Sequence, residues 1–166
     1  TFKEGVGRYA HLVVRPVLYH TRDLRTHEKE KDGVNYHFRK EDYLQDLAKR
    51  LNEEGIRFLT TRINGQLQGL AVDDFIEPNV EVSYVNGAEQ LEVGDEVLED
   101  ADNEKKQVRI KRDGQELTLD GISIFDSERG ALLQGDKITN IDDHNLLVDR
   151  RIKGLESVFA SPKLTV

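Results

Sequence analysis

The sequence contains no cysteine, no methionine and no tryptophan among its 166 residues, and only 3 prolines. Without cysteine it has no disulfide scaffold, no thiolate metal site and no cysteine nucleophile. No apolar run approaches the roughly 20 residues that a transmembrane helix needs. A general nucleic-acid-binding surface depends on lysine and arginine, whereas the formal net charge here is −8. What remains is a soluble, acidic, globular chain, long enough for one domain or two small ones.

The residues present favour an α+β fold that is mainly β. Over 40–54, apolar residues recur at steps of three and four, which predicts an amphipathic helix that ends at Gly55. The strand-like segments 56–60 and 67–72 flank Asn64-Gly65, a strong signal for a tight β-hairpin. Together with strand-like segments further upstream, these elements predict a strand–helix–hairpin unit over residues 1–75.

Residues 76–166 are expected to form a small β-rich module with one late helix. Strands are predicted over 80–85, 107–112, 115–119 and 122–125, and Asp113-Gly114 marks a second hairpin. A second amphipathic helix is predicted over 146–159. The segment 73–79, with Pro78 and three acidic residues, is the predicted boundary, although a loop within a single domain would have the same composition.

One short motif occurs twice. Residues 91–97 and 132–138 both read Leu-x-x-Gly-Asp-x-Val/Ile. In such a motif the glycine permits a positive φ, the aspartate can bond the backbone of the turn, and the next aliphatic residue begins a strand. The motif therefore predicts a turn that leads into a strand, which is an architectural role.

The second copy lies in a longer pattern that resembles the core of bacterial PDZ domains, in particular those of secretion-system and HtrA-type proteins. A Ser-x-x-Ala-like turn at 127–131 precedes Gly135-Asp136-Lys137-Ile138, and the predicted helix and a final strand follow. The resemblance covers Gly121–Val166. It implies a PDZ-like module that binds an extended partner by pairing with an exposed strand edge.

This resemblance makes a protein- or peptide-binding or assembly domain the leading interpretation, non-catalytic and without a cofactor. The expected groove lies between the strand near Ile122 and the helix of 146–159. Its residues would be Gly121, Ile122, Ile124, Leu147 and Arg151. We also expect the chain to be part of a larger envelope- or membrane-associated protein, with no nucleic-acid partner and no membrane span of its own. The absence of cysteine is compatible with a periplasmic or other extracytoplasmic location but leaves the compartment open.

Two alternatives remain from the sequence. If the strand-like segments 9–20 and 33–38 pair as a hairpin, then His11 or His20 faces His37, and an added carboxylate would complete the metal site of a metal-dependent hydrolase. The histidine spacings match no common zinc motif, and no Gly-x-Ser-x-Gly nucleophile motif occurs. The other alternative is a structural subunit of a homo-oligomer.

Overall fold

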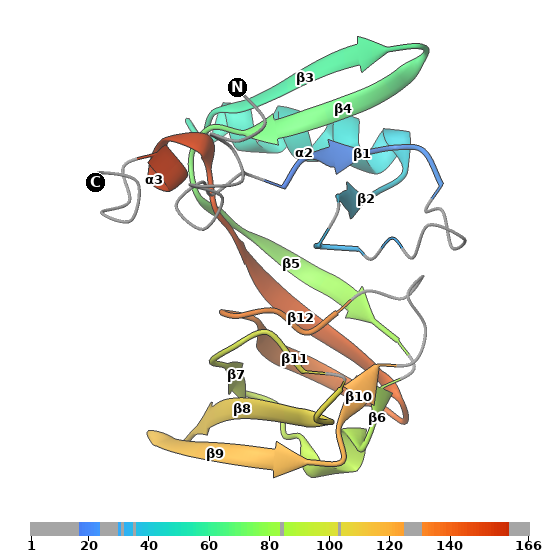
Figure 1. The fold of residues 1–166 in the computed structure, drawn as a ribbon. Coiled ribbons are helices and arrows are strands. Elements are labelled where there is room, and N and C mark those ends of the chain that lie inside the picture. Colours follow the sequence, from blue (N-terminus) through green and yellow to red (C-terminus); the bar gives the residue numbers. More distant parts are fainter. Residues whose placement is uncertain are drawn as a thin grey trace, which may run out of the picture.

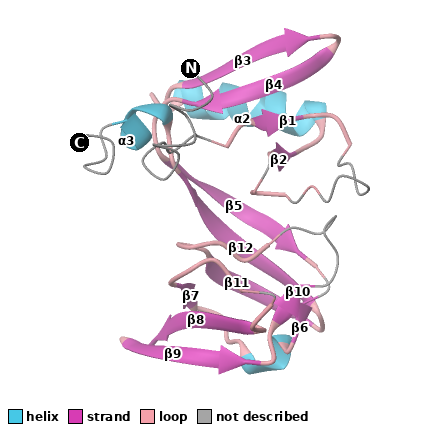
Figure 2. Ribbon diagram, in the orientation of Figure 1, coloured by secondary structure: helices cyan, strands magenta, loops and turns pink. Residues whose placement is uncertain are grey.

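The computed structural model describes residues 17–23, 30, 32–34, 36–83, 85–102, 104–124 and 131–159. Strands dominate, and the fold is α+β and mainly β, as predicted (Figure 2). Within this described part, no helix is both long and apolar enough to span a membrane. The part of the predicted strand segment 9–20 that precedes Val17, with His11 and Pro16, lies outside the described residues.

Among the described residues, a four-stranded sheet and one helix form the N-terminal part (Figure 1). The strand order is β2-β1-β4-β3, and the elements are β1 (Tyr19–His20), β2 (His37–Phe38), α2 (Glu41–Glu53), β3 (Phe58–Ile63) and β4 (Gln66–Ala71). Helix α2 buries Leu44, Leu47, Ala48 and Leu51, which belong to the same apolar cluster as Tyr19, Phe58, Leu67 and Ala71. The predicted helix of 40–54 is therefore confirmed.

Both predicted tight hairpins are confirmed. The β3–β4 turn has φ of 51° at Asn64 and 78° at Gly65. The turn between β8 (Gln107–Arg112) and β9 (Gln115–Asp120) has φ of 51° at Asp113 and 79° at Gly114. Positive φ at both central residues is the signature of the type I′ turn, whose twist matches that of the flanking strands.

A six-stranded sheet forms most of the C-terminal part, with the order β5-β12-β11-β7-β8-β9. Its strands are β5 (Phe75–Val82), β7 (Glu96–Val97), β8 (Gln107–Arg112), β9 (Gln115–Asp120), β11 (Lys137–Asp142) and β12 (Asn145–Ile152). A two-stranded sheet joins β6 (Val85–Asn86) to β10 (Ser123–Ile124), and the short helices are η3 (Ala88–Gln90) and α3 (Leu155–Phe159). A second apolar cluster, which includes Val97, Ile110, Ile122 and Leu132, fills this part.

The predicted helix over 146–159 is wrong for most of its length. Residues 145–152 form strand β12, and only Leu155–Phe159 are helical. Burial along β12 has a period of two, because Leu146, Val148, Arg150 and Ile152 are buried while the residues between them are partly or fully exposed. An arginine in this buried row hid the alternation from a reading based on apolar residues alone.

The ribbon formed by β5 and β12 runs through both parts of the protein (Figure 1). One end contributes Phe75 and Ile152 to the N-terminal cluster, and the other contributes Val80 and Val148 to the C-terminal cluster. The predicted boundary segment 73–79 is thus largely strand. Because β5 and β12 contribute residues to both apolar clusters, they do not separate the chain into two independent cores. The division into two domains, 1–75 and 76–166, stays a prediction.

The proposed hairpin between the first two strands is also wrong. Strand β1 pairs with β2 in parallel, so Tyr19, not His20, lies opposite His37. The other side of β1 pairs with β4 in antiparallel register.

The two copies of the repeated motif bond to each other reciprocally. Gly94 N donates to Ile138 O, and Gly135 N donates to Val97 O, each at 2.8 Å. The glycines occupy equivalent positions, with φ of 98° and 90°. The turns predicted from the motif are present, and they form a locally two-fold symmetric pair that the sequence alone did not indicate.

Each copy also binds an arginine through its aspartate. Asp95 accepts from Arg112 Nε at 2.9 Å and Nη2 at 2.8 Å, while Asp136 accepts from Arg150 Nε at 3.0 Å and Nη2 at 2.9 Å. The Arg112 side chain is 22% exposed, whereas that of Arg150 is 2% exposed. The second pair is therefore an internal ion pair, and the first lies close to the surface.

Candidate functional site

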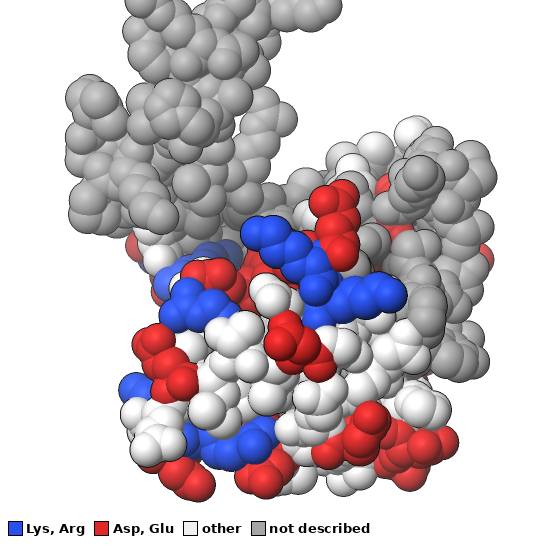
Figure 3. Space-filling view, turned by 60° about the horizontal axis from the view of Figure 1, so that its bottom comes forward, with Lys and Arg blue, Asp and Glu red and all other residues white. Residues whose placement is uncertain are grey.

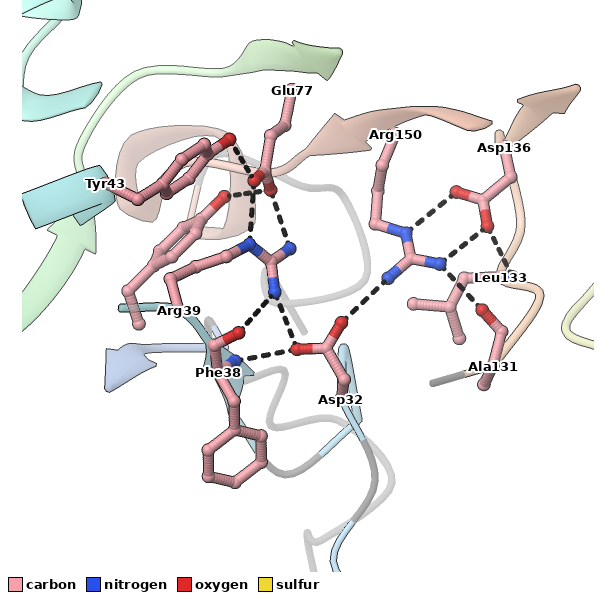
Figure 4. Close-up of polar contacts among 10 residues, drawn as sticks. Asp32, Phe38, Arg39, Tyr43, Glu77, Ala131, Leu133, Asp136 and Arg150 are labelled. Carbon is pink, nitrogen blue, oxygen red and sulfur yellow. Dashed lines mark hydrogen bonds and ion pairs between the residues drawn. The ribbon is translucent and has the colours of Figure 1, made fainter. Parts of the chain in front are cut away.

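A chain of buried charges lies where the β5–β12 ribbon passes from one apolar cluster to the other (Figure 4). Glu77 on β5 accepts from Arg39 Nε at 2.8 Å and from Arg39 Nη2 at 2.9 Å. It also accepts from the hydroxyls of Tyr19 at 2.8 Å and Tyr43 at 2.7 Å. These four donors come from β1, α2 and the residue after β2, so Glu77 ties β5 to the N-terminal part.

These donors hold Glu77 in its ionised form. Burial alone would raise the pKa of Glu77, but the hydrogen bonds and charge of Arg39, together with the two tyrosine hydroxyls, lower it to about 2. The same burial and the nearby carboxylate raise the pKa of Tyr19 and of Tyr43. Neither Glu77 nor the two tyrosines is therefore suited to exchange a proton near neutral pH.

Asp32 continues the chain of charges toward the C-terminal part. Its Oδ1 accepts from Arg39 Nη1 and from the N–H of Phe38, each at 2.7 Å. Its Oδ2 lies 3.7 Å from Arg150 Nη1, which makes an ion pair without a direct hydrogen bond. Arg150 in turn binds Asp136 and donates to the carbonyl of Ala131 at 2.6 Å. Asp32 therefore connects an arginine of each part (Figure 4).

A cleft of about 500 Å³ opens beside this network. One wall is β5 and the residue just after it, and the other is formed by Tyr43 and Arg50 of α2 with the residues around β2. The residues lining it are Asp32, Phe38, Arg39, Tyr43, Arg50, Glu77, Pro78, Asn79, Val80, Glu81 and Ser83. The cleft thus lies between a strand at the end of a sheet and a helix.

The five groove residues predicted from the PDZ resemblance do not line this cleft. Ile122 and Ile124 are buried in the C-terminal cluster, next to Gly121, and Leu147 is half-buried on β12. Arg151 lines a different cleft, of about 490 Å³. The helix expected to face Ile122 is strand β12 for residues 145–152. A binding role for these residues stays a prediction.

The histidines of the metal alternative have other neighbours. The Nδ1 atom of His20 accepts the N–H of Arg22 at 3.1 Å, and the Nε2 atom lies 3.2 Å from the side-chain amide of Gln68. His37 is buried against Tyr19, with ring centroids 4.6 Å apart, and burial lowers its pKa to about 4. Within the part of the chain that the structure describes, no three histidine or carboxylate side chains are grouped to hold a metal ion. His11 lies outside that part.

The second cleft borders a row of alternating charges across the sheet. Asp149, Lys137, Glu96, Lys111 and Glu116 are successive register neighbours on five adjacent strands. Opposite charges at such positions each contribute roughly 0.2–1 kcal/mol to strand pairing. On the face that Figure 3 presents, acidic and basic side chains are likewise interspersed. These charges are explained by sheet pairing and need no ligand.

Comparison with protein families, with curated proteins and with solved structures finds no match for this chain.

The residues that line the first cleft were not predicted from the sequence, although two signals for them were present. Tyr43 and Arg50 are seven residues apart on the predicted helix, which places both on one face two turns apart. Glu77 alternates with Phe75 in a strand-like segment, as a buried residue would. The partner, Arg39, had no signal, because its contact with Glu77 spans 38 positions of the chain.

Proposed function

We propose that the protein is a non-catalytic interaction module that binds an extended segment of a partner protein along β5. The observation that carries this proposal is the position of the cleft, with strand β5 on one wall and helix α2 on the other. A partner segment in such a cleft can add a strand to the sheet while the helix contacts its side chains.

Strand β5 is suited to this role because it ends the six-stranded sheet among the described residues. In an antiparallel ladder the backbone groups of alternate residues point to alternate sides. Since β12 uses one side of β5, the remaining N–H and C=O groups of residues 80–82 point away from the sheet, and no described residue outside the ladder is recorded bonding to them.

Other sheet edges are partly capped by side chains of the protein itself. On β3, the Asn52 amide donates to Phe58 O at 3.2 Å and accepts from Phe58 N at 3.4 Å. At the end of β9, Gln90 donates to Asp120 O at 2.7 Å. No described side chain caps the backbone of residues 80–82 on β5 in this manner. This difference favours β5 as the edge that a partner extends.

The chemistry of the cleft favours binding over catalysis. Each carboxylate oxygen of Glu77 accepts two hydrogen bonds, and all three nitrogens of Arg39 donate to protein oxygens. A general acid or base must instead be free to gain and lose a proton near the working pH. The paired groups therefore serve as a rigid floor for a ligand.

The PDZ resemblance, the envelope association and the periplasmic location remain proposals. The resemblance supports the same mode of recognition, strand addition beside a helix, but the cleft described above is built from residues 32–83 and not from the segment 121–166.

The test is to select peptides from a random displayed library against the immobilised protein and to titrate them into isotope-labelled protein. We expect amide shifts confined to residues 77–83 and to α2. N-methylation of successive peptide residues should weaken binding at every second position, because only alternate amides face β5. The proposal is overturned if no peptide binds, if the shifts lie on β3 or β9, or if N-methylation has no alternating effect.

A further inference from the structure

Arg50 and Arg151 stand apart from the other described arginines, because neither makes an ion pair with another residue that the structure describes. The remaining arginines of the described residues all lie within 4.0 Å of a carboxylate; they are Arg22, Arg39, Arg57, Arg62, Arg109, Arg112 and Arg150. The chain has 32 acidic residues against 24 basic ones, so possible partners are abundant. Each of the two unpaired arginines lines one of the two clefts.

The two unpaired arginines differ in their surroundings. Arg151 shares its cleft with three carboxylates and with Lys111 and Lys137, so that cleft already holds several charges of both signs. The cleft of Arg50 is lined by Glu77 and Asp32, but both bind Arg39, and by Glu81, which accepts from Ser83 at 2.8 Å. Arg50 therefore carries five N–H donors that bind no described residue, whereas the other guanidinium of the cleft, that of Arg39, is already bound.

Arg50 is also held on a rigid element. It lies in the last turn of α2, and Tyr43, two turns earlier on the same face, is anchored to β5 through Glu77. The helix dipole favours a cation near the C-terminus of a helix, so the positive charge of Arg50 does not destabilise α2. The planar guanidinium can bind both oxygens of one carboxylate.

We propose that the segment bound along β5 carries an aspartate or glutamate side chain that pairs with Arg50. This inference rests on the proposed function, since it names the chemistry of the partner for the same cleft. The overall charge of −8 repels acidic partners at long range. Recognition of an acidic residue therefore depends on this local guanidinium, which makes the pairing a determinant of specificity.

Charge reversal tests the inference, with Lys49 as the matched control. Lys49 is the neighbouring exposed residue of α2 and does not line the cleft, so Arg50→Glu and Lys49→Glu change the net charge equally. The peptides are those selected above, synthesised with amidated C-termini so that only side chains carry carboxylates. Binding is measured by calorimetry.

We expect the selected peptides to share an acidic position, and its change to glutamine to weaken binding to the wild type about tenfold. The Arg50→Glu variant should no longer bind these peptides. It should bind peptides in which the acidic residue is replaced by lysine, and bind them more tightly than the wild type does. The Lys49→Glu variant should bind every peptide as the wild type does. Equal effects of the two reversals, or peptides that shift the β5 amides without an acidic preference, would refute the role of Arg50 and leave strand addition standing. Absence of any binding at β5 would refute the proposed function itself.

Discussion

Arg150 and Glu77 are direct register neighbours on β12 and β5, yet the structure records no ion pair between these two described residues. Glu77 binds Arg39 of the N-terminal part, and Arg150 binds Asp136 of the C-terminal part. Asp32 then links the two arginines. At the position between the two apolar clusters, the β5–β12 ribbon therefore carries two buried charges. Glu77 binds the N-terminal part, and Arg150 binds the C-terminal part.

Replacing Glu77 by glutamine should lower the free energy of unfolding by about 3–5 kcal/mol, because Arg39 is left buried without its main counter-charge. Urea denaturation at pH 7 measures the loss. The control is Glu81→Gln, on the same strand but exposed, which should change the value by no more than about 0.5 kcal/mol. Equal midpoints for the two variants would mean that the network contributes no net stability.

Removing both members of the Asp136–Arg150 pair should cost less than removing either one. Arg150→Met alone leaves the buried Asp136 without its arginine, and Asp136→Leu alone leaves the buried Arg150 with only the weaker Asp32 contact, whereas the double variant leaves neither charge. The symmetry-related pair Asp95–Arg112 provides a comparison, because Arg112 is partly exposed and water can solvate it. Double-mutant cycles should therefore give the larger coupling energy for Asp136–Arg150. A larger coupling for the Asp95–Arg112 pair would contradict this account of burial.

Gly154→Ala should destabilise the fold by about 2–3 kcal/mol, because an added Cβ would lie 2.4 Å from both Val72 O and Asp73 C. These are backbone atoms, and the connection between β12 and α3 would have to move away from them. Gly114→Ala serves as the comparison, because a Cβ at Gly114 would meet open space. Only the positive φ at this position strains the alanine, so the variant should lose about 1 kcal/mol of unfolding free energy. Thermal melts of the two variants would refute the prediction if Gly114→Ala were the less stable.

Stability should fall as the pH is lowered from about 6.5 to about 4, because of His37. The folded state holds the pKa of His37 at about 4, below its usual value of 6.5, so the unfolded chain takes up a proton in this interval before the folded chain does. The full effect is on the order of 3 kcal/mol. Urea denaturation at several pH values should show a slope that His37→Phe removes. The same slope should persist in a variant of the exposed His144, and its loss there would contradict the assignment.

The features that were predicted correctly from the sequence are determined by residues that are neighbours in the chain. Asn64-Gly65 and Asp113-Gly114 set their turns through local backbone preference, and the helix of 40–54 follows from its apolar spacing. The repeated Gly-Asp motif likewise marked two real turns. In each case the determining contacts lie within a few residues of the signal.

The failures involve contacts between residues that are distant in the chain. Arg150 is buried only because Asp136 and Asp32 neutralise it, so β12 resembled an amphipathic helix with a polar side. The cleft went unrecognised for a related reason, since Glu77 lies 38 positions from Arg39 and 34 from Tyr43 and meets them only in the folded chain. The parallel pairing of β1 and β2 also depends on a third strand, β4, which occupies the other side of β1.

The passage of one pair of strands through both apolar clusters has a consequence for how the molecule comes apart. Loss of either cluster exposes one end of the same hydrogen-bonded ladder, and the buried charges in its middle then meet water. Neither half can melt while the other keeps its full set of contacts. A heated sample should accordingly absorb its heat of denaturation in a single calorimetric peak, with equal calorimetric and van't Hoff enthalpies.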